Sequence, residues 1–90
     1  MVKLQARPEG GGWVCQVDVD DAGERTKHTV NVSSEELGRW GRGDGQAAVE
    51  DLVLRSFEFL LRREPPGSIL GRFDLSAIEH YFPEYDLEIR

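Results

Sequence analysis

Residues 44–64 predict one long helix whose apolar face is so wide that the rest of the chain has to be arranged around it. At about 100° per residue, the large apolar side chains span an arc of about 220°, about twice the stripe that a surface helix usually buries. They are Val49, Leu52, Val53, Leu54, Phe57, Phe59, Leu60 and Leu61. Asp44 is the expected N-cap, and Pro65-Pro66-Gly67 ends the helix near Glu64. One small sheet covers only part of this arc, so other residues must cover the remainder.

The first third of the chain predicts three strands, because apolar and polar side chains alternate there with a period of two. The alternating runs are residues 2–7, 13–20 and 25–32. The glycine-rich stretch 8–12 separates the first run from the second and suits a turn. We therefore predict a meander of three antiparallel strands.

The alternation also fixes how the second and third strands pair. A loop of two or four residues between them pairs Cys15 with Val30, and Val17 with His28. This register gathers the apolar side chains on one face and pairs opposite charges on the other. A three-residue loop would place Val17 opposite Lys27 and mix the two faces. We predict the first register.

Two short helices are expected, one on each side of the long helix in sequence. Ser33 followed three residues later by Glu36 matches a capping box, and the glycines after it keep that helix short. Ser76 and Glu79 match a second capping box, whose helix ends near residue 82, before a proline. Residues 84–90 fit a strand, a helix or a tail, and their pattern does not decide between these.

The predicted fold class is α+β: a three-stranded antiparallel meander packed against one long helix, with short helices on its N-terminal and C-terminal sides. Residues 1–90 form one domain, with the sheet in 1–32 and the helical part in 33–90. The expected cover for the remaining helix arc is Ile69, Leu70, Phe73, Ile78 and Phe82. If these side chains do not reach, part of the arc stays exposed, and a two-fold homodimer is the simplest way to cover it.

The charge and the cysteine content narrow the function classes. The chain carries 17 acidic and 11 basic residues, a formal net charge of −6, so it lacks the basic face of a typical duplex-binding protein. Its single cysteine cannot form an intramolecular disulfide. No apolar run approaches the roughly 20 residues of a membrane span, and the N-terminus lacks a signal-peptide pattern. We expect an acidic cytoplasmic protein with no membrane partner, and a nucleic-acid partner is not favoured.

A family resemblance is carried by residues 56–85, SFEFLLRREPPGSILGRFDLSAIEHYFPEY. The elements Ser-Phe-Glu-Phe-Leu-Leu and Phe-Asp-Leu-Ser are its distinctive parts, and the segment covers about a third of the chain. It resembles a segment shared by short, functionally uncharacterised bacterial proteins. The resemblance implies a compact α+β domain and a bacterial origin, and it implies no activity and no site residue.

Catalysis is not expected from the residues that could support it. Cys15 and His28 lie diagonally across the predicted hairpin, but a nucleophile pair needs an orienting third group, and none is marked in the sequence. We expect a buried cysteine beside a partly exposed histidine. One cysteine and two distant histidines offer no metal-ligand spacing, so no metal and no cofactor is expected.

We therefore expect a small non-catalytic module that acts through protein–protein contact, as a homodimer or with another protein. The candidate interaction surface consists of Leu52, Leu54, Phe59, Leu61, Arg62, Arg63 and Arg72. The alternative is a small regulatory or nucleic-acid-associated protein that uses Arg62, Arg63 and Arg72.

Overall fold

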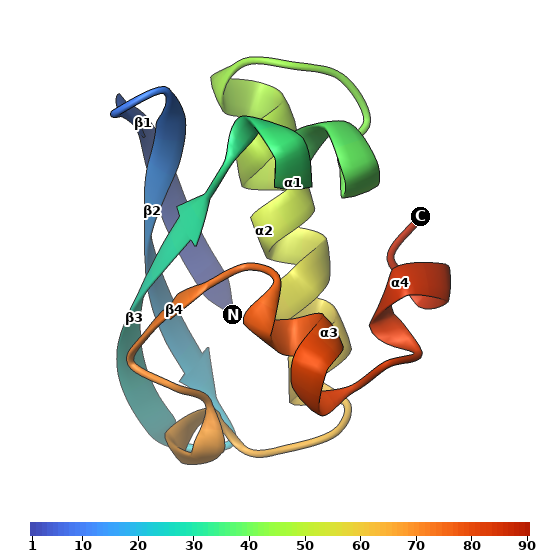
Figure 1. The fold of residues 1–90 in the computed structure, drawn as a ribbon. Helices are drawn as coiled ribbons and strands as arrows, with labels where there is room; N and C mark the ends of the chain where they lie inside the picture. The colour runs from blue at the N-terminus through green and yellow to red at the C-terminus, as the bar shows by residue number, and fades with distance from the viewer.

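The computed structural model describes residues 1–90, and it has an α+β fold with a four-stranded sheet on one side and helices on the other (Figure 1). The strands, in sheet order, are β1 (Val2–Glu9), β2 (Gly12–Asp21), β3 (Glu24–Val32) and β4 (Arg72–Asp74). The helical elements are α1 (Ser34–Trp40), α2 (Gln46–Leu61), the 3-10 turn η1 (Pro66–Ser68), α3 (Ala77–Tyr81) and α4 (Tyr85–Glu88). The α+β class is therefore confirmed.

The predicted register of the meander is confirmed. Cys15 pairs with Val30, and Val17 pairs with His28. Two-residue turns join the strands, and both residues of each turn have positive φ: Gly10 and Gly11 in the first turn, Ala22 and Gly23 in the second. Such turns match the right-handed twist of paired strands. Because the turn between β2 and β3 has an even number of residues, their apolar residues stay on one face.

The sheet has a fourth strand that the sequence pattern did not predict, so the expected three-stranded sheet was wrong in this respect. Strand β4 runs parallel to β3, with Phe73 opposite Val30. The flanking residues extend the pairing, because Thr29 donates its N–H to the carbonyl of Gly71, and Leu75 donates to Asn31. A strand of three residues is too short to show alternation, and its partner lies about forty positions earlier in the chain.

The ends of the helices confirm one predicted cap and correct two others. Ser33 and Glu36 form the capping box at the start of α1, at 3.0 and 2.7 Å. The N-cap of α2 is Gly45, with φ at 88°, rather than Asp44, and α2 ends at Leu61 instead of near residue 64. The side chain of Ser76 makes no capping hydrogen bond, so the second predicted box does not form.

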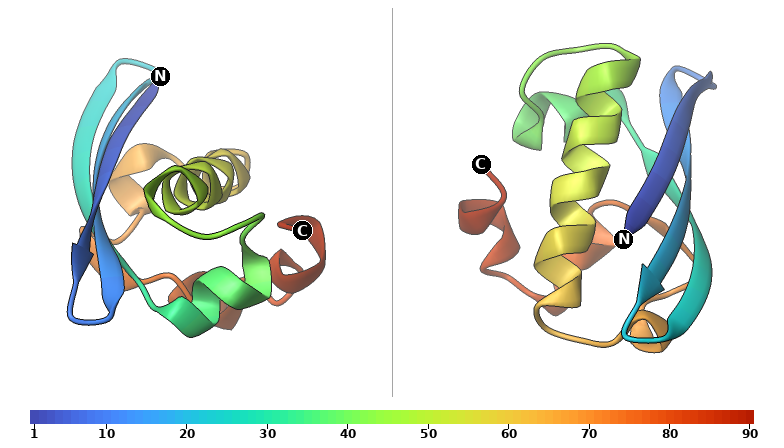
Figure 2. Two further views of the ribbon diagram at one scale, coloured as in Figure 1. Left: turned by 90° about the horizontal axis from the view of Figure 1, so that it is seen from above. Right: turned by 180° about the vertical axis from the view of Figure 1, so that it is seen from behind.

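The C-terminal third covers the side of α2 that is turned away from the sheet (Figure 2). Residues 85–88 are helical, and Tyr85 and Ile89 bury their side chains there. Of the five residues expected to form the cover, Ile69, Phe73 and Ile78 are buried, Phe82 is half-buried and Leu70 is exposed. The wide apolar arc of α2 is thus largely covered within one chain.

Candidate functional site

The apolar residues of the predicted interaction surface are divided between the core and the surface. Leu52 and Phe59 are fully buried, so this part of the prediction was wrong. The ring of Phe59 lies 5.2 Å from that of Tyr85, and the C-terminal third has therefore covered this edge of the arc. Leu54 remains exposed and Leu61 is half-buried.

The three predicted arginines do not gather into one basic patch. Arg63 is engaged by Glu84 at 3.3 Å and by Glu88 at 3.0 Å. Arg62 is exposed at the C-terminal end of α2. Arg72 lies on β4 next to the inward-facing Phe73, so its side chain is on the outer face of the sheet. The sheet itself separates Arg72 from the helical layer.

The environment of Cys15 does not favour a thiol nucleophile. Its side chain is fully buried, and this burial, with a smaller contribution from the charge of Glu50, raises the pKa of the thiol to about 12. A nucleophilic cysteine needs the opposite shift of its pKa.

His28 is buried, whereas the sequence predicted partial exposure. Its Nε2 lies 2.8 Å from the hydroxyl of Thr26, and its Nδ1 lies 2.7 Å from the carbonyl oxygen of Leu70. Both ring nitrogens thus hydrogen-bond to groups other than the Cys15 thiol, so the two side chains do not form the hydrogen-bonded pair that a thiol nucleophile needs. The role of His28 here is structural, because it holds the loop before β4 against β3.

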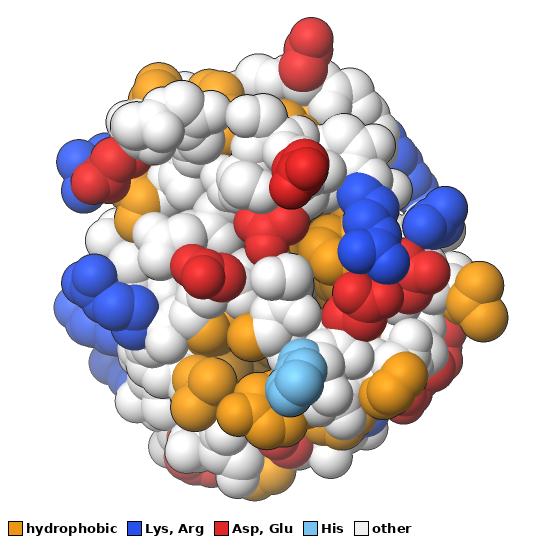
Figure 3. Space-filling view, viewed as in Figure 1, with side chains coloured by type: hydrophobic (Ala, Val, Ile, Leu, Met, Phe, Trp, Pro, Cys, Tyr) orange, Lys and Arg blue, Asp and Glu red, His pale blue; other side chains and the backbone are white.

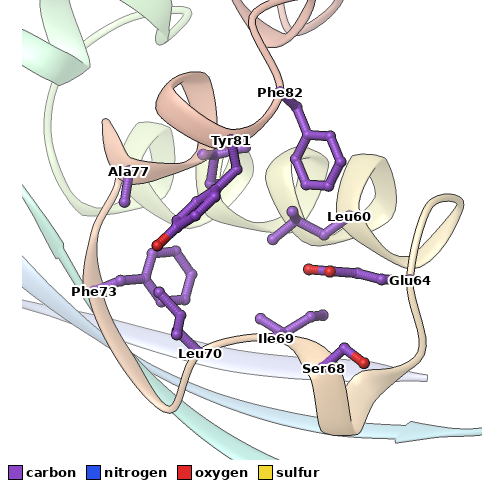
Figure 4. Close-up of a pocket in the computed structure, with 10 residues that line it drawn as sticks. Leu60, Glu64, Ser68, Ile69, Leu70, Phe73, Ala77, Tyr81 and Phe82 are labelled. Atoms are coloured by element: carbon purple, nitrogen blue, oxygen red, sulfur yellow. The ribbon is translucent and has the colours of Figure 1, made fainter.

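A pocket that is mainly apolar opens between the end of α2, the loop from η1 to β4, and α3 (Figure 4). We call it the α3 pocket, and its volume is about 340 Å³. Its ten lining residues are Leu60, Glu64, Ser68, Ile69, Leu70, Phe73, Ala77, Ile78, Tyr81 and Phe82. Eight of the ten are hydrophobic, so the pocket suits an apolar group that has few polar contacts to make.

The local sequence explains why three walls meet at this place. Pro65 and Pro66 end the helical run and start η1, which turns the chain back toward the sheet. The pairing of Phe73 with Val30 then fixes β4, and α3 begins three residues after that strand. The loop and α3 are short, and their packing against the sheet and the end of α2 holds them in place.

The rim of the α3 pocket is exposed. Leu70 and Tyr81 expose 48% and 66% of their surface, although both are large and mostly apolar. The exposed His80 lies beside Tyr81, with the ring centroids 5.9 Å apart. Figure 3 shows hydrophobic side chains gathered around the exposed histidine on this face of the molecule. Clusters of this kind are typical of binding surfaces.

Glu64 is the only charged residue that lines the α3 pocket. Its carboxylate points toward the middle of the pocket, between Leu60 and Ile69 (Figure 4). It is half-buried, and no cation of the chain lies within 4.0 Å of it. A carboxylate among apolar side chains is stabilised by an opposite charge, and this chain does not supply one.

Several pocket residues were predicted from the sequence, but only as the cover of α2. Ile69, Leu70, Phe73, Ile78 and Phe82 were expected to cover α2. Their outer sides also form the walls of the α3 pocket. The sequence feature that could have indicated the pocket is the number of large apolar residues in this short segment, which include Leu70 and Tyr81. A short segment cannot turn so many large side chains inward.

The structure holds no group of three histidine, cysteine, aspartate or glutamate side chains arranged to bind a metal ion. None of its helices combines the length and the apolar character that crossing a bilayer requires. Comparison of the chain with family models, with curated proteins and with solved structures finds no match. The resemblance of residues 56–85 to short bacterial proteins therefore stays a prediction.

Proposed function

We propose that this chain is a small non-catalytic cytoplasmic module that acts through protein–protein contact, and that its partner docks in the α3 pocket. The observation that carries the proposal is the open apolar pocket with the exposed Leu70 and Tyr81 on its rim. Contact of these apolar side chains with water is unfavourable. Burying a side chain of leucine or phenylalanine size contributes about 1.5–3 kcal/mol of favourable free energy. The absence of catalysis is part of the proposal and rests on the buried Cys15 thiol and the engaged imidazole of His28.

The partner is a different protein rather than a second copy. A homodimer was expected as the cover for any part of the α2 arc that the C-terminal residues did not reach, and the buried side chains of Tyr85, Ile89 and Trp40 now help to cover that arc. Leu54 and Leu87 are also exposed, but they do not line a pocket, whereas Leu70 and Tyr81 lie together on the rim of the α3 pocket, which is concave. A concave pocket suits a protruding side chain better than it suits its own copy, because a two-fold interface brings identical surfaces together.

A peptide selection tests the proposal. Random short peptides displayed on phage are selected against the whole chain, and the enriched peptides are then measured against two variants. Ala77→Trp fills the pocket from α3, and Leu70→Ser removes an exposed apolar part of its rim. We expect enriched peptides to lose at least about tenfold in affinity on both variants, which corresponds to about 1.4 kcal/mol.

A matched control lies on the outer face of the sheet. Gln16→Trp adds the same large ring at an exposed position of β2, away from the pocket. The affinity of the selected peptides should be unchanged on this variant. Enriched peptides that bind Ala77→Trp and Leu70→Ser as well as the native chain would contradict the proposed site, as would a failure to enrich any peptide.

A further inference from the structure

We infer that the α3 pocket takes an arginine side chain of the partner protein, and this inference rests on the proposed function. The guanidinium would meet the Glu64 carboxylate and an aromatic ring, while the methylene stem would pack on Leu60 and Ile69. All four parts of this site line the same pocket.

The chain already contains two arginines in such surroundings. The guanidinium of Arg63 lies 3.6 Å above the ring centre of Phe59 and pairs with Glu84 and Glu88. Arg39 lies 4.7 Å above the ring centre of Trp40 and pairs with Glu79 at 2.9 Å. In both places a flat cation rests on an aromatic face and donates to carboxylates. Arg63 and Arg39 thus show that, in this protein, an aromatic face next to carboxylates binds a guanidinium group.

The α3 pocket presents the same combination without the cation. Phe73, Tyr81 and Phe82 supply aromatic surface around the cavity, and Glu64 supplies the carboxylate (Figure 4). Glu64 forms no ion pair within the chain, in contrast to Glu84 and Glu88. The missing part is therefore a cation that comes from outside.

Arginine fits these surroundings better than lysine or a purely apolar side chain. Its guanidinium is planar, stacks on aromatic rings and donates two parallel hydrogen bonds to one carboxylate. It is also less strongly hydrated than an ammonium group, so less free energy is lost when it leaves water. Its stem is apolar and covers the aliphatic wall. A purely apolar side chain would bury Glu64 without a partner, which costs free energy.

The net charge of the chain favours the same partner. A protein with a formal charge of −6 attracts basic segments and repels acidic ones at low salt. The expected partner is thus a basic segment of another protein, in which an arginine projects far enough to enter the pocket.

Two small probes test the chemistry directly. Nα-acetyl-arginine amide and Nα-acetyl-citrulline amide have nearly the same shape, but only arginine carries a charge. Each is titrated into the ¹⁵N-labelled chain, and amide chemical shifts are followed. We expect arginine amide to shift the resonances of residues that line the α3 pocket, and citrulline amide to bind about tenfold more weakly because one charge-assisted contact is lost.

Two matched variants place the effect on one carboxylate. Glu64→Gln should lower the affinity for arginine amide to that for citrulline amide, because it keeps the shape and removes the charge. Glu58→Gln removes an exposed charge on α2 that does not line the pocket, and it should change nothing. Equal binding of the two probes, or equal binding of arginine amide by Glu64→Gln and the native chain, would overturn the inference.

The peptide selection separates this inference from the proposed function. Selected peptides that need an open pocket but contain no arginine, and that bind Glu64→Gln normally, would overturn the inference and leave the docking site in place. Light scattering tests whether the arginine comes from a second copy of the chain. Self-association that rises with concentration and disappears in Glu64→Gln would overturn the assignment to a different protein, because a second copy would then supply the arginine.

Discussion

The β1–β3 meander covers one side of α2, and α3 and α4 of the C-terminal third, residues 66–90, cover the other, while β4 of the same third joins the sheet (Figure 2). The meander and the C-terminal third are held together in different ways. The meander is a continuous set of backbone pairs joined by two-residue turns. The C-terminal third contains η1, β4, α3 and α4, which have between three and five residues each. None of these elements is long enough to be stable alone.

Side chains from distant parts of the sequence hold the C-terminal third in place. The indole of Trp40 donates to Asp86 at 2.9 Å, and the hydroxyl of Ser56 lies 2.7 Å from that of Tyr85. Local pairing therefore builds the meander, and long-range contacts build the other side. The proposed docking site lies in the part that depends on long-range contacts, which is where function is often found.

The largest expected effect comes from removing the ring that both sides share. Phe57 is fully buried, and its ring centre lies 5.3 Å from that of His28 on β3 and 6.2 Å from that of Phe73 on β4. Phe57→Ala should lower the free energy of unfolding by about 3–5 kcal/mol. Urea denaturation measures this loss. Leu54→Ala, on an exposed part of the same helix, should cost much less, and equal losses would contradict the packing of α2.

The two serines of the predicted capping boxes provide a smaller and sharper comparison. The Ser33 hydroxyl accepts the N–H of Glu36 at 3.0 Å, so Ser33→Ala should cost about 1 kcal/mol. The side chain of Ser76 caps nothing, so Ser76→Ala should change the free energy of unfolding by less than about 0.5 kcal/mol. Both values come from denaturant midpoints. A larger loss for Ser76→Ala would mean that the second box forms in solution.

Alkaline pH should destabilise the protein through one buried group on each side. Burial raises the pKa of Cys15 from its ordinary value of 9.0 to about 12, and burial also raises the pKa of Tyr85. In the unfolded chain the thiol ionises near its ordinary pKa. The stability is therefore complete below about pH 9 and is lost as the pH rises from there toward 12.

Two variants assign the alkaline loss to the two sides. Cys15→Ala and Tyr85→Phe should each make the free energy of unfolding fall less steeply with pH, as measured by denaturation at a series of pH values. The effect of Cys15→Ala should begin at the lower pH. A slope that neither variant changes would show that these groups are not the cause.

The smallest expected effect is that of salt, which should speed hydrogen exchange in the C-terminal third and leave exchange in the meander unchanged. Arg63 is paired with Glu84 and Glu88 at partly exposed positions, and salt screens such pairs, which are worth about 0–1 kcal/mol. Raising NaCl from about 0.1 M to about 1 M should speed amide hydrogen exchange in α4 by less than about fivefold. Exchange in β2 should not change. Equal acceleration in α4 and β2 would contradict the proposed difference.

The sequence was sufficient where the structure depends on neighbouring residues. The alternation around Cys15 and Val17 left one register that kept the apolar face intact, and that register formed. The Ser33–Glu36 box formed for the same local reason.

The sequence was insufficient where distant groups compete. Ser76 and Glu79 carry the same motif, but the Glu36 carboxylate accepts the N–H of Ser76 at 2.9 Å, and the Glu79 carboxylate pairs with Arg39. A second role for Glu36 cannot be inferred from its own capping box. The spacing of residues within the motif contains no information about either competitor.

The candidate site was predictable only in its composition. The helix arc identified Leu52 and Phe59 as residues in need of cover, but it could not show that both would be buried within the chain, or that Tyr85 would pack on Phe59. The α3 pocket depends on the end of α2 and on two short segments that the fold brings next to it, the loop from η1 to β4 and α3. Neither short segment has a periodic pattern of its own, so the pocket becomes visible only in the folded chain.

The most direct test of docking in the α3 pocket uses a selected peptide that carries a nitroxide spin label. The label broadens the amide signals of nearby residues in the ¹⁵N-labelled chain, so it locates the bound peptide. We predict broadening at Glu64, Leu70, Ala77 and Tyr81, which line the pocket, and sharp signals at Gln16 on the outer face of the sheet. Broadening centred on the outer face of the sheet, with sharp signals around the pocket, would contradict the proposed docking site.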